Sequence, residues 1–296
     1  MTTKEFQTRG TLSIFFHCFK AHRRLFALDM TCALLMSLVD LAFPYVSRTC
    51  MYDLLPNNLY GTFFAVMGIM LVAYIIRAGL QYIVCYWGHT FGILVEADIR
   101  RDLFTHIQTL SFGFYDKNRT GQLMSRMTAE LFDITELAHH GPEDLFISLV
   151  TVVGAVAVMF TIQWQLALVV AVLIPLAVAV TMFNRRAMAA ASRGVKQQMA
   201  GINADLESSL SGMRTAKAFS NEQAEAAKFD HANEQFKTSK RKFHKAMGRF
   251  NATMDFFLCL LPLAVIAVGG LLIMDGKMTY VDLITFNLYI STFINP

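Results

Sequence analysis

Long apolar stretches alternate with polar ones along the chain. Five of them hold about 20 or more mostly apolar residues, the length that a helix needs to cross a bilayer. They are residues 25–52, 59–84, 143–162, 164–184 and 254–274. A sixth begins at Val281 and reaches the last residue, Pro296. The pattern predicts an all-α membrane protein with six transmembrane helices, of which the sixth, 281–296, is cut short at the chain end.

Two polar stretches, 85–141 and 185–249, separate the spans into pairs. Apolar residues still recur in both at intervals of three or four positions amid charged residues, which is typical of amphipathic helices. Such runs are Ile99, Leu103 and Ile107, and Leu206, Leu210 and Met213. Arms of about 25 residues would reach roughly 35–40 Å beyond the bilayer. We therefore expect long helical extensions of the spans rather than separate domains.

The distribution of basic residues indicates how the helices cross the membrane. The chain is 55% hydrophobic and 16% charged, which is too apolar for an ordinary soluble domain of 296 residues. All but three of its 26 Lys and Arg residues lie in the segment 1–24 and the two polar stretches. Because cytoplasmic loops carry an excess of Lys and Arg, we expect these three regions to be cytoplasmic. The short turns near Pro56, Gln163 and Asp275 should lie outside.

This charge pattern also indicates where the protein is located and which kinds of partner it contacts. We expect an integral protein of the plasma membrane, which in a bacterium is the inner membrane, in contact with lipid and not with nucleic acid. The segment 1–24 lacks the apolar stretch of a secretory signal. One helical face there is apolar and borders basic positions, which is typical of a helix in the membrane interface. The face comprises Leu12, Phe15, Phe16 and Phe19, and the basic positions are Lys20, His22, Arg23 and Arg24. We expect a cytoplasmic N-terminal segment with an elbow helix on the inner leaflet.

Neither the cysteines nor the histidines predict a metal site. The five cysteines, at positions 18, 32, 50, 85 and 259, lack the paired spacing of metal ligands, and we expect them to be reduced. His139 and His140 lie near Glu143 and Asp144. Adjacent residues on a helix point about 100° apart, however, and Pro142 intervenes. We therefore expect no metal to be bound.

The first polar stretch contains a hairpin tip with several aromatic residues. Asp116, Asn118 and Gly121 break the helical pattern there, and Thr120 could cap a new helix. Phe112, Phe114 and Tyr115 would stand exposed on this tip. Exposed apolar clusters usually mark contact surfaces, so we expect a binding partner. The alternative is a helix-turn-helix that packs on itself.

Both polar stretches resemble the intracellular loops of type IV ATP-binding-cassette (ABC) exporters. The first loop of that family carries an aromatic pair, Asp, Thr-Gly, Ser-Arg and an acidic residue. The matching residues are Phe114, Tyr115, Asp116, Thr120, Gly121, Ser125, Arg126 and Glu130. The second loop is matched by Gly212, Lys217, Ala218, Phe219 and Glu222. Together with six spans, the resemblance covers essentially the whole chain, as the transmembrane domain (25–296) of a half-transporter similar to multidrug and lipid exporters.

The resemblance implies what the tips do. In that family each tip, here about 110–122 and 210–222, forms a short coupling helix that lies across an ATPase domain. The residues implied in coupling are Phe114, Tyr115, Asp116, Gly121, Arg126, Glu130, Met213, Lys217, Phe219 and Glu222. The family also works as a homodimer or heterodimer of exporter halves, with the fourth and fifth helices crossing to the opposite protomer. A second exporter half and ABC ATPase domains are therefore the implied partners.

The sequence has no phosphate-binding loop. Such a loop needs Gly-x4-Gly-Lys-Ser/Thr, and the nearest string, Gly276-Lys277-Met278, lacks the earlier glycine and the hydroxyl. We expect no catalytic residues here, and ATP and Mg²⁺ to be bound by a nucleotide-binding domain that this sequence lacks. A chain that ended inside the bilayer would strand helix carbonyls in hydrocarbon, so we expect the sequence to be a fragment.

Ionisable residues inside spans are candidates for a substrate cavity. Arg77 and Asp255 lie at similar predicted depth with opposite charge, which suggests an ion pair near the inner end of a cavity. The alternative is that both extend toward the cytoplasm. Asp40 lies deeper, either lining the cavity or bonding to a neighbouring helix.

An aromatic face of the sixth span is a second candidate for the cavity. Phe286, Tyr289 and Phe293 recur at helical spacing. They form either a lipid-facing surface or a wall that binds apolar ligands. Tyr45 and Tyr74 are weaker candidates of the same kind.

Three functions remain open from the sequence. The first is an ATP-driven exporter half that moves a small amphipathic or hydrophobic substrate, such as a drug, lipid or peptide, by alternating access. The second is a non-transporting membrane assembly or regulatory subunit. The third is a secondary carrier, although the threefold Pro-x-Asp/Glu-x-x-Lys/Arg repeat of mitochondrial carriers is absent.

Overall fold

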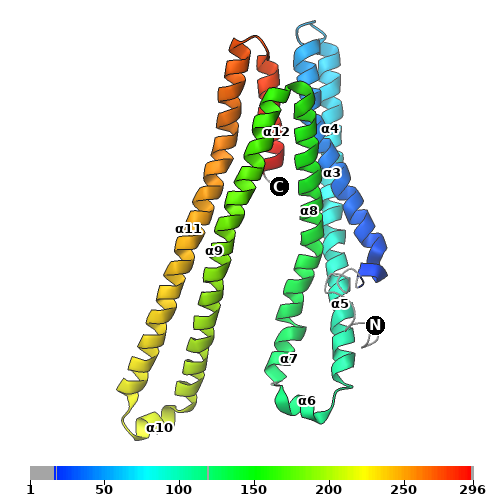
Figure 1. Cartoon of the computed structure of the whole chain (residues 1–296). Helices are drawn as coiled ribbons and strands as arrows, with labels where there is room; N and C mark the ends of the chain where they lie inside the picture. Colours follow the sequence, from blue (N-terminus) through cyan, green and yellow to red (C-terminus); the bar gives the residue numbers. More distant parts are fainter. Residues whose placement is uncertain (1–16, 18, 119, 295–296) are drawn as a thin grey trace. The chain divides into compact units, whose positions relative to one another are not determined.

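The computed structural model describes residues 17, 19–118 and 120–294, with four of these, Gln122, Ala138, His139 and Phe293, described only in their backbone. Every regular element in these ranges is helical, which confirms the all-α prediction (Figure 1). The elements are η1 Phe19–His22, α3 Arg23–Thr49, η2 Cys50–Leu54, α4 Tyr60–Ile83, η3 Val84–Gly88, α5 His89–Ile107, α6 Phe112–Lys117, α7 Thr120–Met127, α8 Ala129–Ile162, α9 Trp164–Ser211, α10 Met213–Ala218, α11 Glu222–Met274 and α12 Tyr280–Ile294.

Five helical segments are long and apolar enough to cross a membrane: Phe19–Leu54, Tyr60–Ile107, Leu123–Ile162, Trp164–Ser211 and Glu222–Met274. Each contains one of the five full spans predicted from the sequence, except for Leu59, which lies one residue before the second segment. The sixth predicted span corresponds to α12, a helix of 15 residues. Most of the expected elbow helix lies outside the described residues.

The polar stretches continue the spans as helix, as predicted. α9 runs 48 residues and α11 runs 53 residues without interruption. At 1.5 Å per residue these helices are roughly 70–80 Å long, more than twice the hydrocarbon thickness of a bilayer. The apolar part of each helix therefore spans the membrane and the polar part extends beyond it.

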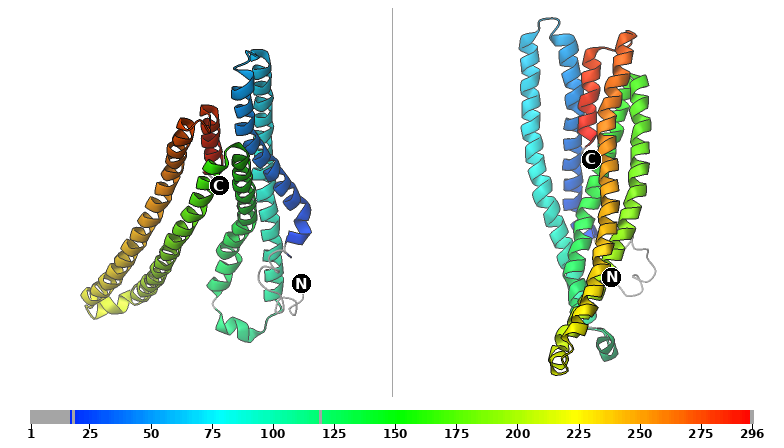
Figure 2. Two further views of the ribbon diagram at one scale, coloured as in Figure 1. Left: turned by 45° about the horizontal axis from the view of Figure 1, so that its top comes forward. Right: turned by 90° about the vertical axis from the view of Figure 1, so that its left-hand side faces the viewer.

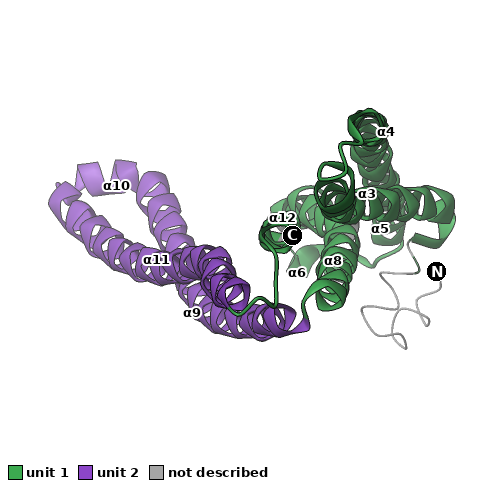
Figure 3. Cartoon of the chain, turned by 90° about the horizontal axis from the view of Figure 1, so that it is seen from above, with its two compact units in different colours: residues 1–163, 275–296 green, residues 164–274 purple. Residues whose placement is uncertain are grey.

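The chain divides into two compact units, shown in different colours in Figure 3. The first comprises residues 1–163 and 275–296. In it α3 packs against α4, α8 and α12. α4, the π-helical turn η3 and α5 form one continuous rod, along which α8 returns (Figure 2). Gly154 of α8 permits close packing, because a Cβ there would lie 2.5 Å from Leu41 Cδ1 of α3.

The second unit, residues 164–274, is a helical hairpin of α9 and α11. The two helices pack along their length, and α10 lies across their end (Figures 1 and 2). Asn184 Nδ2 donates to Thr253 Oγ1 at 3.0 Å, and Lys228 Nζ lies 3.2 Å from Asp205 Oδ1. These bonds tie the helices together within the membrane-spanning part and again near the tip.

Candidate functional site

The first hairpin tip presents an aromatic surface on a short helix. α6 follows α5 after the turn 108–111 and holds Phe112, Phe114 and Tyr115. Phe112 is 91% exposed, whereas Phe114 is half-buried. The Phe114 and Tyr115 rings meet edge to face, with centroids 5.6 Å apart. Phe112 is therefore the aromatic side chain of this tip that is most open to a partner.

Two side chains hold α6 in place. The Tyr115 hydroxyl donates to the Ile107 carbonyl at 2.6 Å, which fixes α6 to the end of α5. The Asn118 amide donates to the Phe114 carbonyl at 2.8 Å, which satisfies a carbonyl at the helix end. Tyr115 thus positions the tip in addition to exposing part of its ring. α7 then begins at Thr120, so the predicted new helix is present.

A polar network that the sequence did not reveal braces the arms of this hairpin. Arg100 of α5 donates to the Met127 carbonyl at 3.1 Å and forms an ion pair with Glu96. The Thr135 hydroxyl of α8 donates to Glu96 at 3.3 Å and also to backbone carbonyls of its own helix. The spacing of four residues between Glu96 and Arg100 could have predicted their ion pair from the sequence. These contacts join α5 to α7 and α8 and make the arm a stiffer lever.

The second tip is built in a similar way from α10. Phe219, which follows α10, is 80% exposed, and Met213 is also exposed. Ser220 has a φ of 52°, in the left-handed region, and the Asn221 amide donates to the Ala216 carbonyl at 2.8 Å. This turn ends α10 and starts α11. Ser209 Oγ donates to Glu225 Oε2 at 2.6 Å, so the tip is braced on both of its helices.

All ten residues implied in coupling therefore lie on or beside the two tips. Apart from the half-buried Phe114, each of these residues is exposed, as a docking surface requires. The exposed charged or polar members are Asp116, Arg126, Glu130, Lys217 and Glu222. Phe112 is exposed on the first tip as the sequence predicted, and the structure adds Leu210 to the exposed apolar surface of the second.

Arg77 forms an ion pair with Asp40 of the same unit, a partner that the sequence did not suggest. Arg77 Nε and Nη2 donate to the two carboxylate oxygens of Asp40 at 2.7 and 2.8 Å. The Asp40 carboxylate therefore joins α3 to α4, which is the helix-to-helix alternative raised by the sequence. Asp255 has an exposed side chain on α11 of the other unit. The sequence did not point to Asp40 as the partner because equal depth does not specify which helices are neighbours.

The aromatic candidates divide into buried and exposed residues. Phe286 and Tyr289 of α12 are fully buried, and the Tyr289 hydroxyl donates to the Leu41 carbonyl of α3 at 3.0 Å. The lipid-facing alternative is therefore wrong for these two residues. Tyr74 packs edge to face on Phe43 at 5.6 Å and is partly exposed, as is Tyr45. The side chain of Phe293 lies outside the described residues.

A group of ionisable residues inside the first unit was also missed. Asp29 of α3 is fully buried within a predicted span, and Glu143 of α8 is nearly so. Asp29 interacts electrostatically with His89, His140 and Glu143. The two histidine rings meet edge to face at 5.2 Å. The position of Asp29 inside an apolar span was the signal that could have found it.

The opposite end of α3 carries a second ion pair, between Arg48 and Asp282. Arg48 Nε donates to Asp282 Oδ1 at 2.7 Å, and its guanidinium lies 5.5 Å from the centroid of the Tyr52 ring. Asp282 also caps α12, because its Oδ2 accepts from the amide and hydroxyl of Thr279. The Asp282 amide in turn donates to Thr279 Oγ1 at 3.2 Å. One carboxylate thus both starts α12 and holds it on α3.

We expect Asp282→Asn to lower the free energy of unfolding by about 1–2 kcal/mol, because it weakens a charge-assisted hydrogen bond and a helix cap together. Thermal unfolding in detergent measures the effect. Asp275→Asn is the matched control, since Asp275 pairs with Lys277 on an exposed turn and should change stability by less than about 0.5 kcal/mol. Equal effects of the two changes would show that the Arg48–Asp282 contact does not stabilise the fold.

Several helices are apolar and longer than a bilayer is thick, and two hairpins end in exposed tips. These features, with the ion pairs inside the spans, define a polytopic integral membrane protein. The sequence model of a protein family, the ABC transporter transmembrane region, matches residues 26–296 of this chain. The chain belongs to this family of ABC transporter transmembrane regions.

Several relatives of this chain are longer proteins that are named as ABC transporters or as an ATP-binding/permease protein. It is 36% identical over 283 residues to the uncharacterized ABC transporter ATP-binding protein YwjA of Bacillus subtilis, covering 95% of this chain and 49% of the relative. It is 27% identical over 267 residues to the putative multidrug export ATP-binding/permease protein YgaD of the same organism, covering 87% and 46%. It is 28% identical over 191 residues to the human ABC-type oligopeptide transporter ABCB9, covering 64% and 25%. The chain spans about half the length of the bacterial relatives it matches.

Proposed function

We propose that this chain is the transmembrane half of an ATP-driven exporter, which moves a small amphipathic or hydrophobic substrate out of the cytoplasm by alternating access. The observation that carries the proposal is the pair of stiff helical hairpins that end in exposed apolar tips at α6 and α10. A rigid arm with a contact surface at its end can transmit movement between a membrane domain and a partner. Coupling then arises because the contacts differ between two states of the partner.

The partner in this proposal is an ABC ATPase domain. The bacterial relatives are named as ATP-binding proteins, and this chain matches only about half of each. ATP and Mg²⁺ would be bound there, and the ATPase chemistry would belong to that domain. A second exporter half, either another copy of this chain or a related one, would complete the substrate pathway across the membrane. The N-terminus and both tips would face the cytoplasm.

The substrate class rests on composition and on one relative. YgaD is named as a putative multidrug exporter, and this chain contains 25 Phe and 17 Met residues. Aromatic and Met side chains repack around varied apolar ligands. Tyr45 and Tyr74 are the described aromatic candidates for the cavity that are accessible in this structure. Phe286 and Tyr289 would reach a substrate only if α12 moved relative to α3.

The experiment that tests the proposal measures transport by the protein assembled with its ATPase domains in sealed vesicles. We expect ATP to drive a change in the vesicle content of an amphipathic dye such as ethidium, and the dye to stimulate ATP hydrolysis. Omission of Mg²⁺ should abolish both. A different result would contradict the exporter and favour the non-transporting subunit: steady ATP hydrolysis that no amphipathic compound of a test panel stimulates, with no movement of dye. Dye movement driven by an ion gradient without ATP would favour a secondary carrier.

A further inference from the structure

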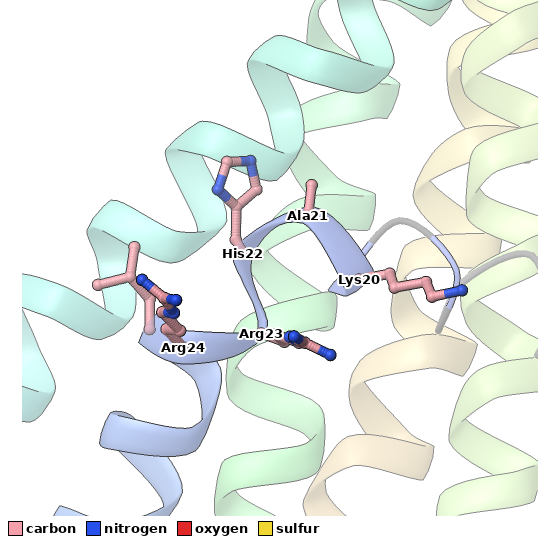
Figure 4. Close-up of a pocket in the computed structure, with 6 residues that line it drawn as sticks. Lys20, Ala21, His22, Arg23 and Arg24 are labelled. Atoms are coloured by element: carbon pink, nitrogen blue, oxygen red, sulfur yellow. The ribbon is translucent and has the colours of Figure 1, made fainter.

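A turn of basic residues at the start of α3 borders a surface pocket. The pocket has a volume of about 520 Å³ and is lined by six consecutive residues, from Lys20 to Leu25. Figure 4 shows Lys20, His22, Arg23 and Arg24 fanning out from this turn. Four basic side chains thus surround one depression on the surface.

The cations of this pocket are available to a ligand. Lys20, Arg23 and Arg24 are exposed, and no ion pair joins them to any residue that the structure describes. His22 has a different role, because its Nε2 lies 2.9 Å from Asp98 Oδ2 on α5. Asp98 also contacts Arg101, so this carboxylate is already shared between two basic groups. The pocket therefore retains three positive charges without a described counter-charge.

An aromatic cluster fixes this turn against the neighbouring helix. The Phe19 ring lies 5.0 Å from that of Phe91 and 5.5 Å from that of Phe26. Leu25 and Ile99 pack against the same cluster. The basic turn is thus held in place by apolar packing on one side and by the His22–Asp98 contact on the other. A site built in this way is formed before its ligand arrives.

The position of the turn selects the kind of ligand. It marks the point where the first membrane-spanning segment begins, so its charges lie at the level of lipid headgroups. The first turn of α3 contains no acidic residue, and no side-chain cap satisfies its first amides. α3 continues directly from the 3-10 helix η1, so the basic side chains, and not a free helix end, attract an anion here. A phosphate group at this level would pair with the three basic side chains.

We propose that this pocket binds the headgroup of an anionic phospholipid, with Lys20, Arg23 and Arg24 contacting the phosphate. A membrane lipid is favoured over a soluble phosphate because Leu25 and Phe26, which are only partly buried, place apolar surface beside the charges, where acyl chains would lie. The site does not depend on transport, and it holds whether or not this chain exports a substrate.

The test uses the two tryptophans as local reporters in the assembled protein. Trp87 of η3 is one helical turn before Phe91 and is exposed, whereas Trp164 begins α9 at the other end of the spans. Trp164→Phe leaves Trp87 as the reporter near the pocket, and Trp87→Phe leaves Trp164. Each protein is reconstituted in mixtures of brominated phosphatidylglycerol and brominated phosphatidylcholine. The quenching curve gives the relative affinity for the anionic lipid.

We expect Trp87 to report a preference for phosphatidylglycerol of at least about fivefold, the factor contributed by a single basic residue at an anionic surface. Trp164 should report about equal affinity for both lipids. The triple variant with Lys20→Gln, Arg23→Gln and Arg24→Gln should show no preference at Trp87, that is, a ratio of about one between the two lipids. The matched control, Lys240→Gln, Arg241→Gln and Lys242→Gln on the exposed surface of α11, removes the same charge and should leave the preference unchanged.

Two further measurements keep the proposal falsifiable if the triple variant folds poorly. In the unaltered pocket, about 1 M salt should remove the preference, since the screening length falls to about 3 Å. A preference that survives salt, or one equal at both tryptophans, would overturn the site. Inorganic phosphate at millimolar concentration should not reduce the preference. Displacement by inorganic phosphate would assign the pocket to a soluble anion and overturn the lipid proposal.

Discussion

Asp40→Asn alone is expected to lower the free energy of unfolding by about 2–3 kcal/mol. The change leaves the Arg77 guanidinium without its bidentate partner between α3 and α4. Breaking a fully buried pair costs about 3–5 kcal/mol, and these side chains are 28% and 31% exposed, so a smaller loss is expected. We predict this loss because an unpaired Arg77 charge near hydrocarbon destabilises the fold more than an uncharged side chain would.

A matched experiment removes both charges of the pair at once. Asp40→Leu combined with Arg77→Met replaces the pair by apolar side chains and should recover most of the stability lost by either single change, measured by thermal unfolding in detergent. Asp53→Asn, on the exposed turn that follows α3, is the control and should have little effect. A double variant that is no more stable than the weaker single variant would show that the Asp40–Arg77 pair is not what joins these helices.

Replacing Phe112 and Phe219 by Ala is expected to reduce ATP-driven transport at least tenfold while leaving the unfolding temperature nearly unchanged. Both rings are largely exposed, so they contribute little to the fold of this chain. Aromatic residues at the centre of an interface often contribute about 2 kcal/mol each, which corresponds to roughly 30-fold in affinity. Loss of these anchors should separate ATP hydrolysis from substrate movement, measured side by side in vesicles.

A control for this result is available on the same arm. Phe104 of α5 is also exposed but lies on the shaft of the hairpin, before the tip. Phe104→Ala should retain transport within about twofold, because the shaft residue has no docking role in this account. Comparable losses for the tip and shaft variants would mean that the exposed aromatics act generally, for example on stability in the membrane, and not through docking.

The spans and hairpins were predictable because length and hydropathy determine them directly. A span requires about 20 apolar residues, and the helical period continued through the polar stretches. α4 begins at Tyr60 and ends at Ile83, close to the predicted 59–84. The break that the sequence marked at Asn118 separates α6 from α7. Gly212, which was known from the sequence only as a match to the second loop, precedes α10.

The contacts between helices were not predictable from one sequence. Arg77 bonds to a residue 37 positions away, and Arg48 to one 234 positions away. The hydrophobic pattern gives the depth of a residue in the membrane, but it gives neither the rotation of each helix nor the identity of its neighbours. The same limit applies to Phe286 and Tyr289, whose shared face was predicted and whose burial against α3 was not.

Photocrosslinking from the tips tests most directly whether the hairpins couple this chain to an ATPase domain. A benzophenone amino acid would replace Phe112 or Phe219 in the assembled protein, with the same replacement of Phe104 as the reference. We predict crosslinks from both tips to the ATPase domain, changing in yield when ATP is bound, and none from position 104. Tip positions that crosslink to the ATPase domain no more than position 104, with or without ATP, would contradict the account.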